Sequence, residues 1–201
     1  MERIIKSDIR EVKKALREKY KGIRANMKSS AKLVSDNEIY LKFINCDSYK
    51  NAKTIFTFVS TNIEVDTIKI IKQALLDKKV VAVPKCLDKN GKMAFYQITS
   101  FDDLSQQTYG LLEPNINTCK KISEYYDAVC IVPGFSFDPM GYRIGFGKGF
   151  YDRFLSEFVG IKIGICYNNC IDSKLPHGRY DIAVNYIITE KYTITVRGNE
   201  N

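Results

Sequence analysis

The segment 133–155 is rich in glycine and also contains arginine, lysine and aspartate side chains. The residues that could bind a ligand or take part in a reaction are, in order, Arg143, Gly145, Gly147, Lys148, Gly149 and Asp152. Glycines lack a Cβ atom, so they can adopt positive φ and let the backbone approach a phosphate closely, while Arg and Lys add full positive charges. The carboxylate of Asp152 is placed to reach toward a cation. This segment therefore predicts a site for phosphate and metal.

The flanking residues indicate how such a segment would be positioned. The run from Asp127 to Val132 is short, apolar and rich in β-branched residues, which predicts a buried strand, whereas Tyr151, Phe154, Leu155 and Phe158 recur at helical spacing. The glycines thus fall between a strand and a helix. The unpaired N–H groups and the dipole at a helix N-terminus attract anions.

Two familiar nucleotide motifs are absent from this segment. Gly149 follows Lys148 where a Walker A loop needs Ser or Thr, and the alternation Gly145-x-Gly147-x-Gly149 is tighter than Gly-x-Gly-x-x-Gly. A glycine-rich turn alone is also compatible with a flexible surface loop. The neighbouring Arg, Lys and Asp favour a functional interpretation.

The string from Val132 to Leu155 resembles the signature of the 5-formyltetrahydrofolate cyclo-ligase family, also called the methenyltetrahydrofolate synthetases. Further pieces resemble the family in the same order, namely Lys13-x-x-Leu16-Arg17, Glu64-Val-Asp-Thr67, Tyr109-Gly-Leu-Leu-Glu-Pro114 and Leu175-Pro-His-Gly-Arg-Tyr-Asp181. Two positions depart from the usual pattern. Lys148 stands where many relatives have glycine, and Phe150 lacks the hydroxyl of the usual tyrosine.

The resemblance implies a fold, an activity and two cofactors. The fold would be α/β, a three-layer α/β/α sandwich with a mostly parallel or mixed central sheet, formed by a single domain over residues 1–201. The activity would be the ATP-dependent cyclisation of 5-formyltetrahydrofolate to 5,10-methenyltetrahydrofolate, with release of ADP and phosphate. ATP phosphorylates the formyl oxygen in this reaction, N10 attacks the formyl carbon, and Mg²⁺ assists.

The resemblance also assigns roles to individual residues. The catalytic residues would be Arg143, Lys148 and Asp152. ATP would be bound by Lys13, Arg17, Arg143, Gly145, Phe146, Gly147, Lys148, Gly149, Phe150 and Tyr151. The folate would be bound by Glu64, Tyr109, Phe146, Lys148, Gly149, Phe150 and Tyr151, and the metal by Asp152 and Asp181. Arg24 matches a recurrent basic position of the family.

Simpler explanations exist for several of these residues. Lys13 and Arg17 lie four residues apart on one side of a helix, as solvated cations often do. An isolated Asp such as Asp152 or Asp181 is more often a cap or turn residue than a metal ligand. Cys166 and Cys170, near His177, do not supply enough ligands at suitable spacing for zinc.

Composition places the chain among globular proteins. Its 201 residues are 45% hydrophobic and 27% charged, enough to bury a core. The absence of long apolar runs predicts no membrane partner and a cytoplasmic location. The six cysteines lack a C-x-x-C pair, so reduced thiols are expected. We expect a monomer whose partner is the small-molecule folate, which can carry a polyglutamate tail.

The net charge of +8 raises a rival function. Clustered Lys and Arg bind nucleic acid, and aromatic residues interleaved with them, as at 142–150, can stack on bases. In this chain the cations are spread and alternate with acids, so we expect no nucleic-acid partner. A nucleotide sensor with the same loop but no turnover is a third possibility.

Periodicity predicts the remaining elements. An apolar stripe from Ile5 to Tyr20 predicts a first helix, and Gly22 would end or interrupt that helix. A second helix is predicted over residues 33–44. Strands are expected at 54–59, 80–84, 93–98, 160–166 and 185–188, with a helix through 70–75 capped by Asp66 or Thr67. Asn90-Gly91 predicts a hairpin turn, and Tyr109-Gly110 with Glu113-Pro114 a turn followed by a strand end.

Overall fold

The computed structural model describes residues 8–88, 91–106 and 112–196. Its centre is an eight-stranded mixed sheet with the strand order β12-β11-β10-β7-β1-β2-β3-β6. The strands of this sheet are β1 (Thr54–Phe56), β2 (Val80–Cys86), β3 (Met93–Ile98), β6 (Lys121–Ile122), β7 (Ala128–Val132), β10 (Ile161–Ile165), β11 (Tyr186–Ile188) and β12 (Thr193–Thr195). The five strands from β11 to β2 pair in parallel, and β12, β3 and β6 pair antiparallel at the two sides. The predicted mixed α/β sheet is therefore confirmed.

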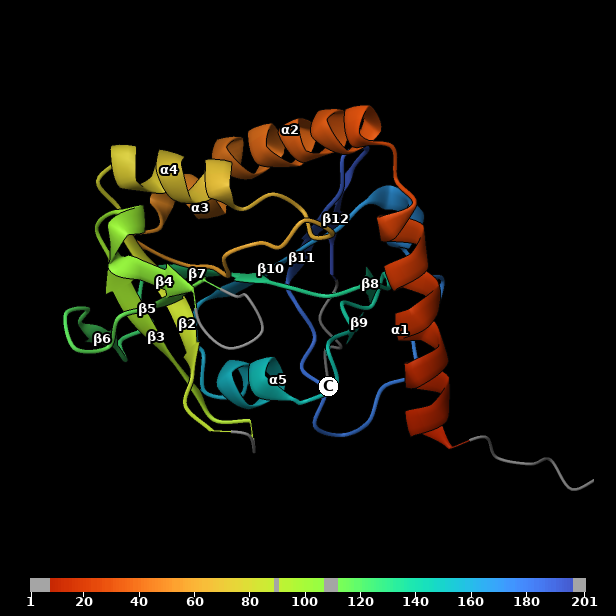
Figure 1. The fold of residues 1–201 in the computed structure, drawn as a ribbon. Helices are drawn as coiled ribbons and strands as arrows, with labels where there is room; N and C mark the ends of the chain where they lie inside the picture. The colour runs from red at the N-terminus through yellow and green to blue at the C-terminus, as the bar shows by residue number, and fades with distance from the viewer. Residues whose placement is uncertain (1–7, 89–90, 107–111, 197–201) are drawn as a thin grey trace, which may run out of the picture.

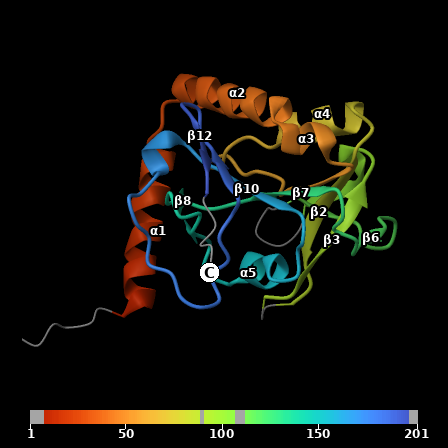
Figure 2. The same ribbon diagram turned by 180° about the vertical axis from the view of Figure 1, so that it is seen from behind.

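Helices cover both faces of the sheet. The helices α2 (Ser29–Asn45), α3 (Asp47–Asn51) and α4 (Ile68–Leu76) lie over one face, and α5 (Phe150–Leu155) lies under the other (Figures 1 and 2). The first helix, α1 (Ile9–Ala25), stands across one end of the sheet, beside the hairpin of β8 (Ser136–Phe137) and β9 (Arg143–Ile144) (Figure 1). Shorter elements complete the fold, namely η1 (Phe101–Asp103), β4 (Leu104–Gln106), β5 (Leu112–Pro114) and η3 (Asn168–Cys170).

The buried strands explain the parallel centre. Every residue of β7 is buried, and Val81, Ala82 and Val83 of β2 are fully buried, as expected for strands covered on both faces. The helix α4 makes the crossover from β1 to β2 and buries Ile70, Ile71 and Ala74. Because parallel strands share a direction, the segments that follow β1, β7 and β10 all emerge at one edge of the sheet, which we call the carboxyl edge. Open α/β sheets bind ligands at this edge.

Some local predictions need correction. α1 continues through Gly22 to Ala25, so that glycine neither ends nor interrupts the helix. β1 ends at Phe56, three residues before the predicted end, because the chain turns there toward the carboxyl-edge loop. The β8–β9 hairpin, which periodicity did not predict, interrupts the connection between β7 and the glycines. Asn90 and Tyr109 lie outside the described residues.

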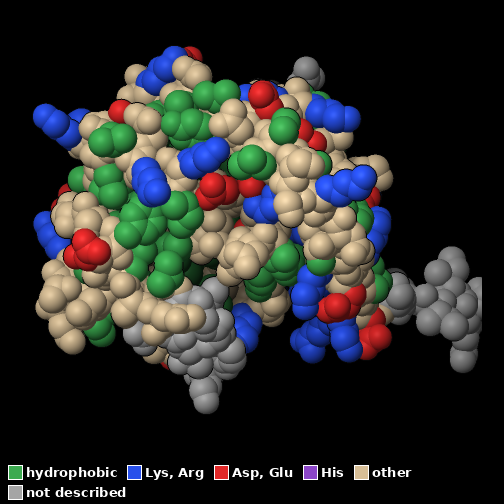
Figure 3. Space-filling model, turned by 45° about the horizontal axis from the view of Figure 1, so that its top comes forward, with side chains coloured by type: hydrophobic (Ala, Val, Ile, Leu, Met, Phe, Trp, Pro, Cys, Tyr) green, Lys and Arg blue, Asp and Glu red, His purple; other side chains and the backbone are tan. Residues whose placement is uncertain are grey.

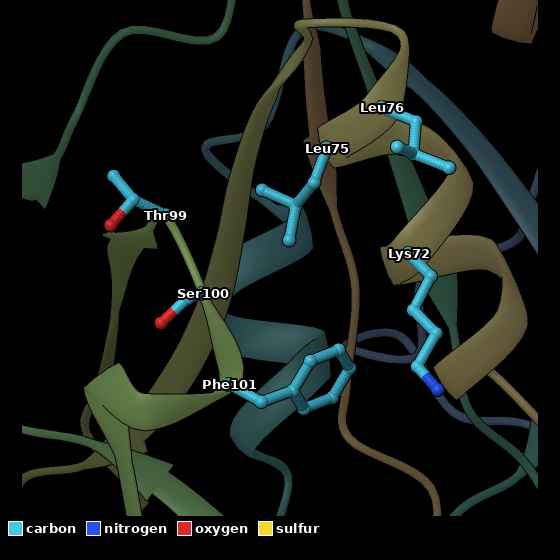
Figure 4. A pocket seen from close by; sticks show the side chains of 6 residues that line it. All are labelled: Lys72, Leu75, Leu76, Thr99, Ser100 and Phe101. Atoms are coloured by element: carbon cyan, nitrogen blue, oxygen red, sulfur yellow. The ribbon is translucent and has the colours of Figure 1, made fainter.

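One open hollow lies away from the carboxyl edge. It is bounded by α4 and by the turn after β3, and is lined by Lys72, Leu75, Leu76, Thr99, Ser100 and Phe101 (Figure 4). Ile98, which precedes this turn, pairs with Val81 near the start of β2, so the hollow belongs to the opposite edge of the sheet. Among the described residues, no helix is long and apolar enough to cross a membrane.

Candidate active site

Two cations of α1 reach the segments that follow the sheet. Asp8 caps the helix by accepting a hydrogen bond from Arg10 N, and the apolar side of the helix packs inward through Leu16, Tyr20 and Ile23. Lys13 Nζ donates to both carboxylate oxygens of Asp181, at 2.9 and 2.7 Å. Arg17 Nε donates to Gly145 O at 2.9 Å. The predicted pair Lys13 and Arg17 therefore lies at the predicted site.

Arg143 and Asp152 form the second ion pair of the site. Arg143, on β9, is almost fully buried and donates to Asp152 Oδ1 at 2.8 Å and to Ile182 O at 2.7 Å. Ile182 N also donates to Asp152 Oδ1, at 3.2 Å. The other carboxylate oxygen, Asp152 Oδ2, has no hydrogen-bond partner among the described residues. One oxygen thus fixes the carboxylate while the other remains free to bind a ligand.

Asp181 is the second predicted metal ligand, and it adjoins this pair through its neighbour Ile182. Gly178 N donates to Asp181 Oδ2 at 2.6 Å. Partial burial opposes the charge of Asp181, but the hydrogen bonds from Gly178 and Lys13 and the charges of Lys13 and Arg143 outweigh it, so the pKa of Asp181 lies below its ordinary value. Asp181 is consequently an anion at neutral pH, with Lys13 as its counter-ion.

The glycine segment connects β9 to α5. Gly147 and Gly149 have positive φ, of 94° and 68°. Gly145 does not, although its sequence position had suggested the same freedom. Gly149 is the N-cap of α5, which has only six residues. The predicted helix after the glycines is present, but it ends at Leu155, before Phe158. It is too short to contribute a large dipole.

The end of the β2–β3 hairpin lies against this segment. Arg153 of α5 donates to Gly91 O at 3.1 Å through Nε and to Lys148 O through one terminal nitrogen. Lys148 is exposed. Burial raises the pKa of Cys86 at the end of β2, and the charge of Lys148 lowers it by less. Arg153 was not among the predicted site residues, because nothing in the sequence pairs it with residue 91.

Aromatic rings border the glycines. Phe146 is exposed and packs against Phe135, with ring centroids 4.7 Å apart. Tyr151 packs edge-on against Phe95 at 6.3 Å, and its hydroxyl is buried without a hydrogen-bond partner. Burial raises the pKa of Tyr151, and the charge of Glu64 raises it further. Phe150 is partly exposed at the start of α5. A buried hydroxyl without a partner is a candidate for a ligand contact.

Glu64 lies in the loop after β1 and is buried. Thr61 N and Thr61 Oγ1 each donate to Glu64 Oε2 at 2.8 Å, and the backbone carbonyl of Glu64 accepts from Tyr167 at 3.1 Å. Tyr109, the remaining predicted site residue, lies outside the described residues.

The carboxylates fit a magnesium ion that also binds phosphate. Mg²⁺ prefers octahedral oxygen ligands and usually takes one or two carboxylates together with waters and phosphate oxygens. Asp152 Oδ2 is free for this purpose, and Asp181 is available if Lys13 moves to the phosphate. Among the described residues, no group of three or more His, Cys, Asp or Glu could hold a metal ion. This donor set suits magnesium and does not suit a structural zinc ion.

The cysteines are unpaired, and the charges on one face of the molecule are dispersed. All six cysteines are free thiols, and Cys130, Cys166 and Cys170 are buried. On the face drawn in Figure 3, Lys and Arg are scattered among acidic and uncharged side chains and form no continuous basic patch. That distribution gives little support to a nucleic-acid interface on this face.

Comparisons with known proteins identify the family and the fold. A probable 5-formyltetrahydrofolate cyclo-ligase of Caenorhabditis elegans is 29% identical to this chain, over 94% of this chain and 97% of the relative. The solved 5,10-methenyltetrahydrofolate synthetase of Aquifex aeolicus superposes with a TM-score of 0.82 at 27% identity, covering 94% of this chain and 95% of that one. The synthetase of Mycoplasma pneumoniae, at 21% identity and a TM-score of 0.68, shares the fold. The profile of the 5-formyltetrahydrofolate cyclo-ligase family matches residues 9–190, so this chain belongs to that family.

Proposed function

We propose that this protein is an ATP- and Mg²⁺-dependent 5-formyltetrahydrofolate cyclo-ligase. The observation that carries the proposal is the meeting of two ion pairs beside the glycine segment. Lys13 pairs with Asp181, Arg143 pairs with Asp152, and Ile182 links the two pairs. Such a set of cations, carboxylates and left-handed glycines suits a nucleotide phosphate with its metal. Family membership supplies the folate half of the proposal.

The reaction requires a poor leaving group to be activated. Ring closure joins N10 of tetrahydrofolate to the formyl carbon on N5, and the formyl oxygen must depart. Transfer of the γ-phosphoryl group of ATP to that oxygen converts it into a phosphate ester and releases ADP. N10 then attacks the carbon, phosphate leaves with the former formyl oxygen, and the N10 proton passes to solvent. The products are 5,10-methenyltetrahydrofolate, ADP and phosphate.

The protein's part in phosphoryl transfer is positioning and charge neutralisation. Arg17, whose guanidinium lies beside Gly147, and Lys148, the residue after that glycine, would bind phosphate oxygens. Arg143 is held rigid by Asp152 and by Ile182 O, so it presents a fixed positive charge. Lys13 can exchange its carboxylate partner for a phosphate when the nucleotide binds. No covalent protein nucleophile is needed for this chemistry.

Asp152 and Asp181 are the residues that would hold the magnesium ion. When bound, Mg²⁺ would neutralise charge on the transferred phosphoryl group and orient it. The fixed Oδ1 and free Oδ2 of Asp152 make it the principal ligand. Asp181, already ionised and anchored by Gly178 N, would complete the protein's share of the ligands.

Glu64 and the aromatic residues are placed to orient the folate. Thr61 holds one oxygen of the buried Glu64 carboxylate, so the other can accept hydrogen bonds from the amino-pterin edge. The Tyr151 hydroxyl, buried without a partner, can donate to a ligand oxygen or nitrogen. Phe146 and Phe150 offer rings for stacking, and the missing hydroxyl at Phe150 leaves this role intact.

The setting of the activity is also part of the proposal. We infer that residues 1–201 act as one domain, as a monomer in the cytoplasm, on a small-molecule substrate without a membrane or nucleic-acid partner. The family match over residues 9–190 supports the single domain. The scattered cations of Figure 3 favour attraction of small polyanions over binding of a nucleic-acid strand.

The test is an absorbance assay with the purified protein, 5-formyltetrahydrofolate and Mg²⁺, with and without ATP. We expect near-ultraviolet absorbance from the conjugated methenyl product only when ATP is present. The variant Lys148→Ala should raise the ATP concentration needed for half-maximal rate. ATP binding without ADP release would identify a nucleotide sensor instead. Salt-dependent binding of single-stranded nucleic acid, unaffected by ATP and folate, would favour the nucleic-acid function.

A further inference from the structure

A second hollow of about 420 Å³ lies where α1 turns into α2. We call it the α1–α2 hollow, and the lining residues that matter here are Arg24, Ser29, Lys32, Asp36, Asn62 and Ile63. None of them is among the residues that the family resemblance assigns to ATP, metal or pterin. Unlike the hollow of Figure 4, which contains one Lys and is mainly apolar, this one carries a buried positive charge.

That charge belongs to Arg24, whose residue is only 5% exposed. One terminal guanidinium nitrogen donates to Gly134 O, while Nε is buried without a hydrogen-bond partner. Among the described residues, no carboxylate lies within ion-pair distance of Arg24. A guanidinium has five N–H donors and stays charged at all relevant pH values, so leaving it buried and unpaired is costly. The costs of such an arrangement are offset when an anion binds.

The nearby acid does not neutralise this charge. Asp36 Oδ2 accepts from Lys32 at 2.6 Å. Asp36 Oδ1 accepts from Tyr167 at 2.8 Å and from Asp66 N at 3.2 Å. Both oxygens of Asp36 are therefore engaged with other groups. With Arg24 and Lys32 against the single carboxylate of Asp36, the hollow keeps one positive charge without a counter-ion.

The hollow adjoins the candidate folate site. Asn62 and Ile63 line it, and the next residue along the chain is Glu64. On the other side, the Arg24 guanidinium lies 5.6 Å from the centre of the Phe135 ring, which in turn packs against Phe146 of the glycine segment. The hollow thus lies beside both the loop that carries Glu64 and the ring pair of Phe135 and Phe146.

We propose that the α1–α2 hollow binds the carboxylates of the glutamyl tail of the folate substrate. The groups of the molecule support this, because a folate carries a polar pterin, an aromatic aminobenzoyl group and an anionic glutamate. The hollow holds Arg24 and Lys32, and it adjoins both the loop of Glu64 and the ring of Phe135. The inference rests on the proposed function and adds to it the group that positions the far end of the substrate.

The experiment measures steady-state kinetics with two substrates, namely 5-formyltetrahydrofolate and its analogue 5-formyltetrahydropteroate, which lacks the glutamate. Since charge-assisted hydrogen bonds are the strong ones, the wild-type protein should show a KM about 10-fold or more higher for the pteroate, with similar kcat. In Arg24→Met, which removes the charge but keeps side-chain bulk, the two KM values should become nearly equal.

A second variant covers the case in which Arg24→Met does not fold. Ser29 is exposed at the start of α2 and lines the hollow, so Ser29→Glu adds a repelling charge there without removing a native contact. A carboxylate in the first turn is compatible with the helix. The matched control is Ser30→Glu, because Ser30 is equally exposed, lies in the same turn and is absent from the lining. Ser29→Glu should reduce the KM ratio, and Ser30→Glu should leave it unchanged.

The outcomes separate this inference from the proposed function. Cyclisation of both substrates with equal KM values in the wild-type protein would overturn the tail subsite and leave the cyclo-ligase function standing. A KM ratio that Ser29→Glu does not change would have the same meaning. Failure of the wild-type protein to cyclise either substrate would overturn the proposed function, and the tail subsite with it.

Discussion

At the scale of single residues, the carboxylate of Asp152 has a structural role and, in the proposed function, a second role as a metal ligand. Its Oδ1 accepts hydrogen bonds from Arg143 and from Ile182 N, which fixes both the side chain and the loop that carries Asp181. Its Oδ2 is free to bind a metal ion. Because Arg143 is almost fully buried, loss of the carboxylate would leave a buried cation without its counter-ion. A test of the catalytic role must therefore preserve the structural one.

The variant Asp152→Asn meets that requirement. Its amide oxygen can still accept from Arg143 and Ile182 N, so the protein should fold, but the negative charge that holds the metal is lost. We expect turnover to fall about a hundredfold or more, the scale for removal of one electrostatic stabiliser. The measurement is kcat at saturating ATP, with circular dichroism as the check on folding.

The control is Asp102→Asn, because Asp102 is exposed on η1 by the opposite edge of the sheet. The kcat of this variant should equal that of the wild-type protein. Near-normal turnover in folded Asp152→Asn would remove Asp152 from the site.

Residue identity was more predictable than residue pairing. The motif around residues 143–152 marked Arg143 and Asp152, which do lie together. The partner of Lys13 is Asp181, 168 positions away in sequence, and no local pattern joins them. Arg24 matched only a basic position, and its burial without a counter-ion follows from the packing of α1 against Gly134. Pairings of this kind depend on the tertiary fold.

At the scale of elements, the glycine segment and α1 fit together closely. A Cβ atom built on Gly147 would lie 3.0 Å from the Arg17 guanidinium, and Gly147 has φ of 94°. Around Gly145, by contrast, no heavy atom of the described residues, apart from its two chain neighbours, lies within 4 Å of such a Cβ, and its φ is not in the left-handed region. Two glycines of one motif are therefore constrained very differently.

This difference gives a matched pair of variants. Gly147→Ala places a side chain in a left-handed conformation, at a cost of about 1–3 kcal/mol, and pushes Arg17 away from the phosphates. The KM for ATP should rise severalfold and the free energy of unfolding should fall. Gly145→Ala should change both quantities little. Steady-state kinetics and urea unfolding of the two variants test the expectation, and equal effects of the two substitutions would contradict it.

Element prediction succeeded where periodicity was strong. The buried strand β7 and the amphipathic α1 follow from apolar patterns. The helix continues through Gly22 because Tyr20 before it and Arg24 after it are both buried, and this packing outweighs the low helix propensity of glycine. The β8–β9 hairpin was missed because its strands have two residues each, too few for a period. Its turn did carry a signal in Asp138, which accepts from Met140 N and Tyr142 N, and in Gly141 with φ of 85°.

At the scale of the whole molecule, α1 joins segments that follow different strands. Besides the contacts of Lys13 and Arg17, Tyr20 donates to Asp172 Oδ2 at 2.6 Å beyond β10, and Arg24 donates to Gly134 O beyond β7. The helix thus stands across the carboxyl edge and completes the candidate site (Figure 1). The sandwich was predictable from alternating elements, but this placement of α1 was not, because it depends on contacts distant in sequence.

Acid should weaken the ion pair between Lys13 of α1 and Asp181. The pKa of Asp181 is below 3.8 in the folded protein, so its contribution to stability is present above pH 3.8 and is lost as the pH falls through the lowered value. We expect Asp181→Asn to reduce the free energy of unfolding by about 1 kcal/mol at pH 6, the scale of a good ion pair, and by less at pH 3. Urea unfolding at both pH values measures this. The exposed Glu124→Gln serves as the control, and a deficit of Asp181→Asn that is equal at both pH values would contradict the ion-pair account.

The most direct test of the account follows one oxygen atom. The purified protein is given 5-formyltetrahydrofolate labelled with ¹⁸O in the formyl group, together with ATP and Mg²⁺, and the released phosphate is analysed by mass spectrometry. If the formyl oxygen is phosphorylated before ring closure, each methenyl product is accompanied by one ADP and one phosphate carrying a single ¹⁸O. Unlabelled phosphate alongside the methenyl product would show that ATP is hydrolysed without activating the formyl group, and would contradict the proposed mechanism.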